Sequence, residues 1–82
     1  MSKKDKLISK LLSKPKDFTW SETKTLMEGF GFILKKGNGS RAKFIHEKNN
    51  IVIAFHKPHP GNILKEYVVK RLIETLKIHE LI

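Results

Sequence analysis

Three short segments in the middle of the chain are separated by turn-forming residues, and this pattern restricts the fold most. Residues 32–36, 41–46 and 51–56 are rich in apolar, aromatic and β-branched side chains, which favour strands. Residues 37–40 read Gly-Asn-Gly-Ser and residues 48–50 read Lys-Asn-Asn, and both are typical of turns between antiparallel strands. The sequence therefore predicts a three-stranded antiparallel meander.

Helical patterns flank these strands. Residues 2–14 place Leu7, Ile8, Leu11 and Leu12 on one face, ahead of Pro15. A second helix begins at Thr19, where Glu22 completes a capping box, and it ends at Gly29-Phe30-Gly31. We interpret Trp20 as a core residue of this helix. The third helix is expected to run from an Asn62 cap to about Ile78. Its predicted buried positions are Leu64, Val68, Val69, Leu72, Ile73 and Leu76.

The order of elements is therefore α-α-β-β-β-α. It predicts an α+β fold, a two-layer sandwich in which the helices pack on one face of the sheet and the other face is partly open. The 82 residues are enough for a single domain spanning residues 1–82.

Alternation along the second and third strands predicts which side chains reach the open face. Phe44 is large and apolar, so its side of the sheet should be covered, which leaves Arg41 and Lys43 on the open side. In the third strand Ile51, Ile53 and Phe55 form the bulkier set, and Val52, Ala54 and His56 share the open side. Two cations and an imidazole together predict a phosphate-binding surface. The alternative is that these cations only protect a strand edge and that His56 is an ordinary strand-end residue.

The charge balance agrees with a polyanionic partner. Seventeen Lys and Arg face eight Asp and Glu, which gives a formal charge of +9. Nucleic acid, an anionic membrane surface and an acidic protein are all compatible with this excess, and so is a merely solvated lysine-rich surface. The chain has no cysteine, which is compatible with the cytoplasm. No apolar run approaches the roughly 20 residues that span a bilayer. The first helix is basic and amphipathic, but Pro15 ends it early and its apolar face is narrow, so we expect no membrane partner.

The segment from His56 to Asn62 is the most informative. It places His56 and His59 in a proline-stiffened loop, with Lys57 between them and a predicted helix N-terminus after them. No carboxylate lies in this loop, so we expect neither a metal nor another cofactor. On RNA, however, histidines can move protons without a metal, because the 2′-hydroxyl is an internal nucleophile.

These residues resemble the HicA-type mRNA interferase toxins. The resemblance rests on Gly31-Phe32, on residues 39–44 (Gly-Ser-Arg-Ala-Lys-Phe) and on residues 56–62 (His-Lys-Pro-His-Pro-Gly-Asn). It implies a double-stranded-RNA-binding-domain-like fold, a toxin that cleaves mRNA in the cytoplasm, and an acidic HicB-type antitoxin as partner. The expected roles are His59 and His56 in catalysis, and RNA contacts from Ser40, Arg41, Lys43, Lys57 and Asn62.

One position departs from the family pattern. The family's usual motif is Gly-Ser-His, with that histidine catalytic, and the matching position here is Arg41. An arginine cannot act as a general base at its ordinary pKa. Two alternative functions therefore stay open. The chain is either a non-catalytic RNA-binding module or an interaction module that docks on an acidic protein.

Overall fold

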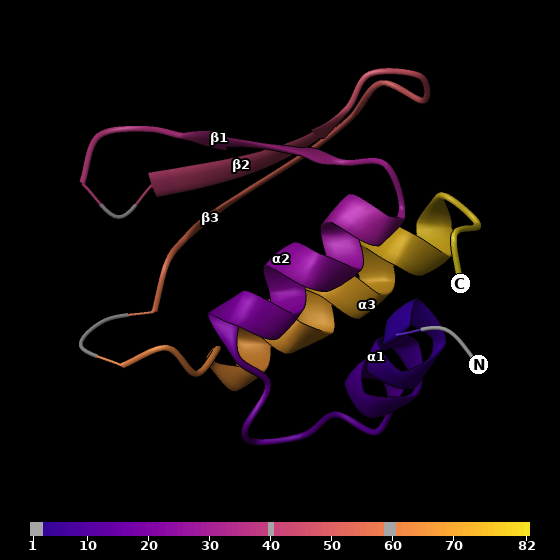
Figure 1. Cartoon of the computed structure of the whole chain (residues 1–82), viewed down its shortest axis with the longest axis vertical. Helices are drawn as coiled ribbons and strands as arrows, with labels where there is room; N and C mark the ends of the chain where they lie inside the picture. Colours follow the sequence, from indigo (N-terminus) through magenta and orange to yellow (C-terminus); the bar gives the residue numbers. More distant parts are fainter. Residues whose placement is uncertain (1–2, 40, 59–60) are drawn as a thin grey trace.

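The computed structural model describes residues 3–39, 41–58 and 61–82, and in these residues it has three helices and a three-stranded sheet (Figure 1). The elements follow the order α-α-β-β-β-α, which confirms the predicted α+β class. Their bounds are α1 Lys3–Leu12, α2 Trp20–Gly29, β1 Ile33–Lys36, β2 Arg41–His46, β3 Ile51–His56 and α3 Glu66–Ile78.

The sheet is an antiparallel meander with the strand order β1-β2-β3. Helices α2 and α3 lie on one side of the sheet and share a core with it, and no helix lies on the other side (Figure 1). The core between these layers includes Phe44 and Ile53 from the sheet and Leu26 and Leu72 from the helices. All six predicted core positions of the last helix are buried. None of the helices in the described residues is long and apolar enough to cross a membrane.

Both ends of α2 form as the sequence predicts. The Thr19 hydroxyl accepts a hydrogen bond from the Glu22 N–H at 3.1 Å, and the Thr19 N–H donates to the Glu22 carboxylate at 3.0 Å. At the other end Gly31 has a φ of 97°, a left-handed conformation that glycine adopts without strain. This allows the Phe32 N–H to donate to the Met27 carbonyl at 3.0 Å and close the helix. The chain is thereby turned directly into β1.

The predicted start of the last helix is wrong, because Asn62 does not cap it. Helix α3 begins at Glu66, and residues 62–64 run in extended form beside residues 18–20. The Trp20 N–H donates to the Asn62 carbonyl at 2.6 Å, and the Leu64 N–H donates to the Phe18 carbonyl at 2.8 Å. These bonds commit the backbone to an extended path, which outweighs the local preference of asparagine for a helix cap.

Helix α1 packs against α2 and α3 rather than against the sheet (Figure 1). Leu11 is fully buried there, and Leu7 and Ile8 are partly buried. Leu12, which we expected on the same face, is 43% exposed, because α1 ends at this residue and its contact surface is narrow. The first helix therefore contributes to the core without covering the open face.

Candidate functional site

The predicted strand parity is confirmed. In β2 the side chains of Ala42 and Phe44 are buried, whereas Arg41 and Lys43 are exposed. In β3 the side chains alternate in the same way, with Ile51, Ile53 and Phe55 buried and Val52, Ala54 and His56 exposed. The cations and the imidazole therefore share the open face.

The strand register brings these groups into neighbouring rows. Arg41 lies directly opposite His56, and Lys43 lies between Lys35 of β1 and Ala54 of β3. Because directly opposite residues on one face of a sheet have Cβ atoms only about 5 Å apart, Arg41 and His56 can contact the same phosphate. The small Ala54 side chain leaves space beside them.

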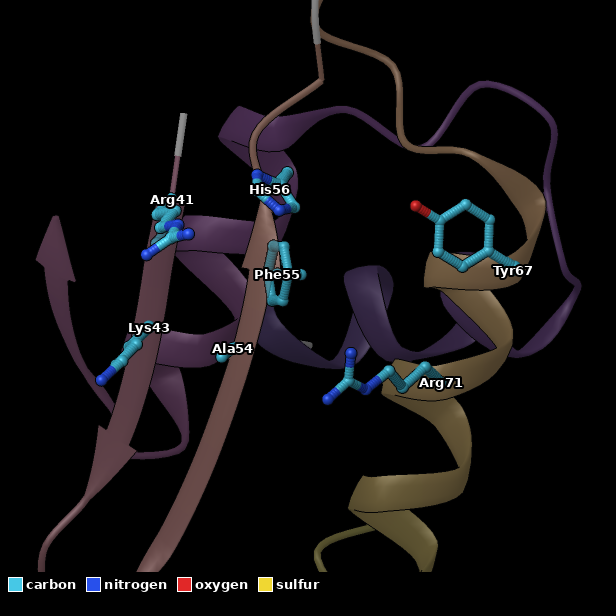
Figure 2. Close-up of a pocket in the computed structure, with 8 residues that line it drawn as sticks. Arg41, Lys43, Ala54, Phe55, His56, Tyr67 and Arg71 are labelled. Atoms are coloured by element: carbon cyan, nitrogen blue, oxygen red, sulfur yellow. The ribbon is translucent and has the colours of Figure 1, made fainter. Parts of the chain in front are cut away.

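A hollow of about 440 Å³ lies where β3 meets α3 (Figure 2). Arg41, Lys43 and His56 line it from the open face of the sheet. The buried Ala42 and Phe55 line it as well, so the hollow is not confined to the open face. Tyr67 and Arg71 line it from α3, one helical turn apart. Sequence reasoning missed these two residues. The signal for them was an aromatic residue and an arginine at i and i+4, outside the buried stripe of the helix.

Two neighbouring hollows extend the cationic surface on either side. One of about 420 Å³ lies toward β1 and shares Arg41 and Lys43 with the first, adding Lys35 and Lys36. The other, of about 100 Å³, shares His56 and Tyr67. It adds Lys57 and Lys65. No carboxylate is among the described residues that line the three hollows. We call this continuous surface the cationic track.

The opposite end of the open face is apolar. Ile33, Ile45 and Val52 lie opposite one another across the three strands. Val52 is 60% exposed, and Ile33 is also exposed. A cross-strand apolar row of this kind, next to cations, is typical of a surface that a protein partner covers.

Three other residues that the sequence analysis singled out, Lys57, Trp20 and Asn62, are among those that the structure describes. Lys57 lines the track, with its Nζ 6.0 Å from the centre of the Trp20 ring. Trp20 itself packs against the core and contacts the Phe55 ring edge-on, at 5.4 Å between centroids, which confirms its predicted place. Asn62 is exposed, but the helix N-terminus that motivated its anion-binding role lies elsewhere. The predicted sites at Ser40 and His59 lie outside the described residues.

His46 shows that the histidines of the chain differ in their surroundings. It is only 8% exposed and faces the helices, with its Nε2 3.0 Å from the Phe30 carbonyl oxygen. Its Nδ1 accepts a hydrogen bond from the Asn49 N–H at 3.2 Å. Both ring nitrogens are therefore occupied by backbone groups. Within the described residues no cluster of three or more metal-ligating side chains is found, and the metal-free site stays a prediction.

Comparison with known proteins agrees with the resemblance read from the sequence. The family model described as the HicA toxin of bacterial toxin–antitoxin systems matches residues 20–78. The match covers α2, the sheet and α3 and leaves α1 outside. Neither the curated proteins nor the solved structures contain a match to this chain. The matched region holds the whole cationic track, and the chain belongs to the HicA toxin family.

Proposed function

We propose that this chain is the toxin of a type II toxin–antitoxin pair and acts as a metal-independent ribonuclease on mRNA. The observation that carries the proposal is the juxtaposition of His56 and Arg41 in a track lined by cations and free of carboxylates among its described residues. Such a track attracts a phosphate backbone, and the imidazole supplies a proton-transfer group beside it. We expect it to act in the cytoplasm, where mRNA is found.

The proposed reaction is an internal transfer within the RNA. The 2′-oxygen forms a bond to phosphorus while the bond from phosphorus to the 5′-oxygen breaks, leaving a 2′,3′-cyclic phosphate and a 5′-hydroxyl. One histidine, His56 or His59, accepts the 2′-hydroxyl proton, and the other donates a proton to the departing 5′-oxygen. Arg41 and Lys43 stabilise the negative charge on the phosphate oxygens in the transition state.

A second candidate function is RNA binding without cleavage. Arg41 favours it, because it stands where the family's usual motif has a histidine, and a guanidinium holds a phosphate but does not exchange a proton near neutral pH. In this case the cationic track binds the same RNA, and the RNA is recovered intact.

The proposed protein partner is an acidic HicB-type antitoxin that covers the open face. The chain's formal charge of +9 complements an acidic protein. The exposed row of Ile33, Ile45 and Val52 gives that partner an apolar contact beside the cations. A small acidic protein encoded beside this chain should bind it and stop cleavage.

The test is incubation of the purified chain with mRNA in EDTA, followed by separation of the products on a gel. We expect cleavage, and a loss of about 100-fold or more in rate for His56→Ala, for His59→Ala, or for both. His79→Ala is the matched control, because His79 is exposed after the end of α3 and lies outside the track.

Full cleavage by both the His56→Ala and the His59→Ala variants would show that the assigned chemistry is wrong. Intact RNA in a stable complex with the unaltered chain would instead support the binding-only function. Expression of the unaltered chain should arrest bacterial growth if it cleaves mRNA.

A further inference from the structure

Tyr67 and Arg71 occupy an exposed face of α3 that packing does not explain. The buried stripe of this helix consists of Val68, Val69, Leu72, Ile73 and Leu76. Tyr67 lies outside this stripe and is 65% exposed, and Arg71 is exposed one turn further along. Arg71 forms no ion pair with any described residue. A large aromatic ring left in solvent beside an unpaired guanidinium is typical of a binding surface.

Both side chains are directed toward β3, the edge strand that carries His56 (Figure 2). Figure 2 shows the Tyr67 hydroxyl pointing across the hollow toward β3 and the Arg71 guanidinium extending toward the same strand. Arg41 and His56 line the hollow from the other side. The hollow therefore has one wall from the sheet and one from α3, with a cation in each wall.

The composition of these walls indicates the class of ligand. The volume of about 440 Å³ is within the range of small-molecule sites. An inorganic anion needs only the cations, whereas the exposed tyrosine ring adds a flat apolar surface of the kind on which nucleobases stack. The small Ala54 side chain in the same hollow leaves room for a base. A ring next to two arginines and a histidine fits a nucleotide, with its base on the ring and its phosphate on the cations.

We propose that this hollow is the subsite for one unpaired RNA nucleotide, whose base stacks on Tyr67 and whose phosphate lies between Arg71 and Arg41. The inference rests on the proposed function, and it names the class of substrate for the same site. A base can reach the tyrosine ring only after leaving a helical stack, so the subsite selects single-stranded RNA over duplex RNA.

Affinity measurements test the subsite directly. The probe is a fluorescent single-stranded RNA with methylated 2′-hydroxyls, which binds without being cut, and a duplex of the same sequence serves as comparison. We expect Tyr67→Ala to weaken single-strand binding about 5- to 150-fold, and Tyr67→Phe to retain it, because stacking needs only the ring. Both substitutions should leave duplex binding unchanged.

Arg71 is tested against a neighbour that carries the same charge. Arg71→Ala should weaken single-strand binding, whereas Lys70→Ala should change it little. Lys70 lies next to Arg71 on α3, but it pairs with Glu66 and lies outside the hollow. An abasic nucleotide placed at successive positions of the probe should weaken binding to the unaltered chain at one position. That effect should disappear in the Tyr67→Ala variant.

The outcomes separate the subsite from the function it rests on. If Arg41→Ala and Lys43→Ala weaken RNA binding but Tyr67→Ala does not, the nucleotide subsite is wrong and the proposed RNA function stands. Equal weakening of single-strand and duplex binding by Tyr67→Ala also overturns the subsite. If none of these substitutions affects RNA binding, both proposals fail.

Discussion

His46 and His56 end consecutive strands of one sheet, yet their chemistry differs because they face opposite sides. His46 faces α2, accepts the Asn49 N–H at Nδ1, and lies close enough to the Phe30 carbonyl for Nε2 to donate to it. These contacts use one ring nitrogen as an acceptor and the other as a donor, both toward backbone groups. His56 faces the cationic track. At the scale of the residue, strand parity therefore separates a structural histidine from a candidate catalytic one.

Arg41 is the position at which a single substitution tests the proposed cleavage activity. Arg41→His would restore the family's Gly-Ser-His pattern at a position directly opposite His56. Because an imidazole exchanges protons near neutral pH and a guanidinium does not, we expect RNA cleavage in EDTA to become about 100-fold faster. The measurement is the initial rate of cleavage of a defined RNA.

The matched control for this substitution is Arg41→Lys, which keeps a cation but adds no group that titrates near neutral pH. It should bind RNA and show no gain in rate. A histidine variant no faster than the lysine variant would show that position 41 takes no part in proton transfer in this chain.

At the scale of the elements, an ion pair between Lys10 and Glu22 joins α1 to α2. The Lys10 ammonium lies 2.8 Å from the Glu22 carboxylate, which also accepts the Thr19 N–H of the capping box. Partial burial raises the pKa of Glu22, but hydrogen bonds from Lys10 and Thr19 outweigh it and hold the pKa below its ordinary value. The same contact raises the pKa of Lys10. One carboxylate therefore supports both the start of α2 and the docking of α1.

This contact predicts a loss of stability in acid. Since the pKa of Glu22 is lower in the folded chain, its contribution is present above the ordinary glutamate pKa of about 4.3 and is lost as the pH falls through the folded value. Glu22→Gln should lower the free energy of unfolding by about 1 kcal/mol at neutral pH. Urea unfolding measured from neutral pH into acid should show that difference shrinking below about pH 4.

Glu28→Gln provides the comparison on the same helix, because Glu28 is exposed and forms no ion pair with the described residues. It should change the stability little at any pH. If the Glu22 and Glu28 variants have the same free energy of unfolding at each pH, the packing of α1 against α2 does not depend on the Glu22 carboxylate.

The elements also show what the sequence could and could not predict. Ala42 and Phe44 are apolar and alternate with cationic residues along β2. This alternation predicted which face of the sheet is open, because successive side chains of a strand point to opposite faces. The prediction of a helix cap at Asn62 was wrong because residues 18–20, which are distant in sequence, form hydrogen bonds with the backbone of residues 62–64. Tyr67 and Arg71 were missed because their i, i+4 spacing shows only that they share an exposed face of the helix, whereas the packing of α3 beside β3 brings that face to the hollow.

At the scale of the whole molecule, the lysines and arginines include two groups that lie on different parts of the surface. Seven lysines and arginines line the cationic track, namely Lys35, Lys36, Arg41, Lys43, Lys57, Lys65 and Arg71. Other lysines lie on α1, which packs on the side of α2 and α3 away from the sheet (Figure 1). If net charge alone attracted RNA, a single lysine of either group would contribute equally to binding. If the cationic track binds the RNA backbone, only the lysines and arginines of the track contact phosphates.

The salt dependence of RNA binding distinguishes these two cases. Each phosphate contact to a single strand contributes about −0.7 to the slope of log affinity against log salt, so four to seven contacts predict a slope of about −3 to −5. Lys43→Ala should make this slope shallower by about 0.7. Lys6→Ala, which removes the same charge from exposed α1, should leave the slope unchanged. The measurement is a titration of the methylated single-stranded RNA at several salt concentrations. Equal slopes for the two variants would mean that the sheet face does not hold the backbone, because the charge would then act from any part of the surface.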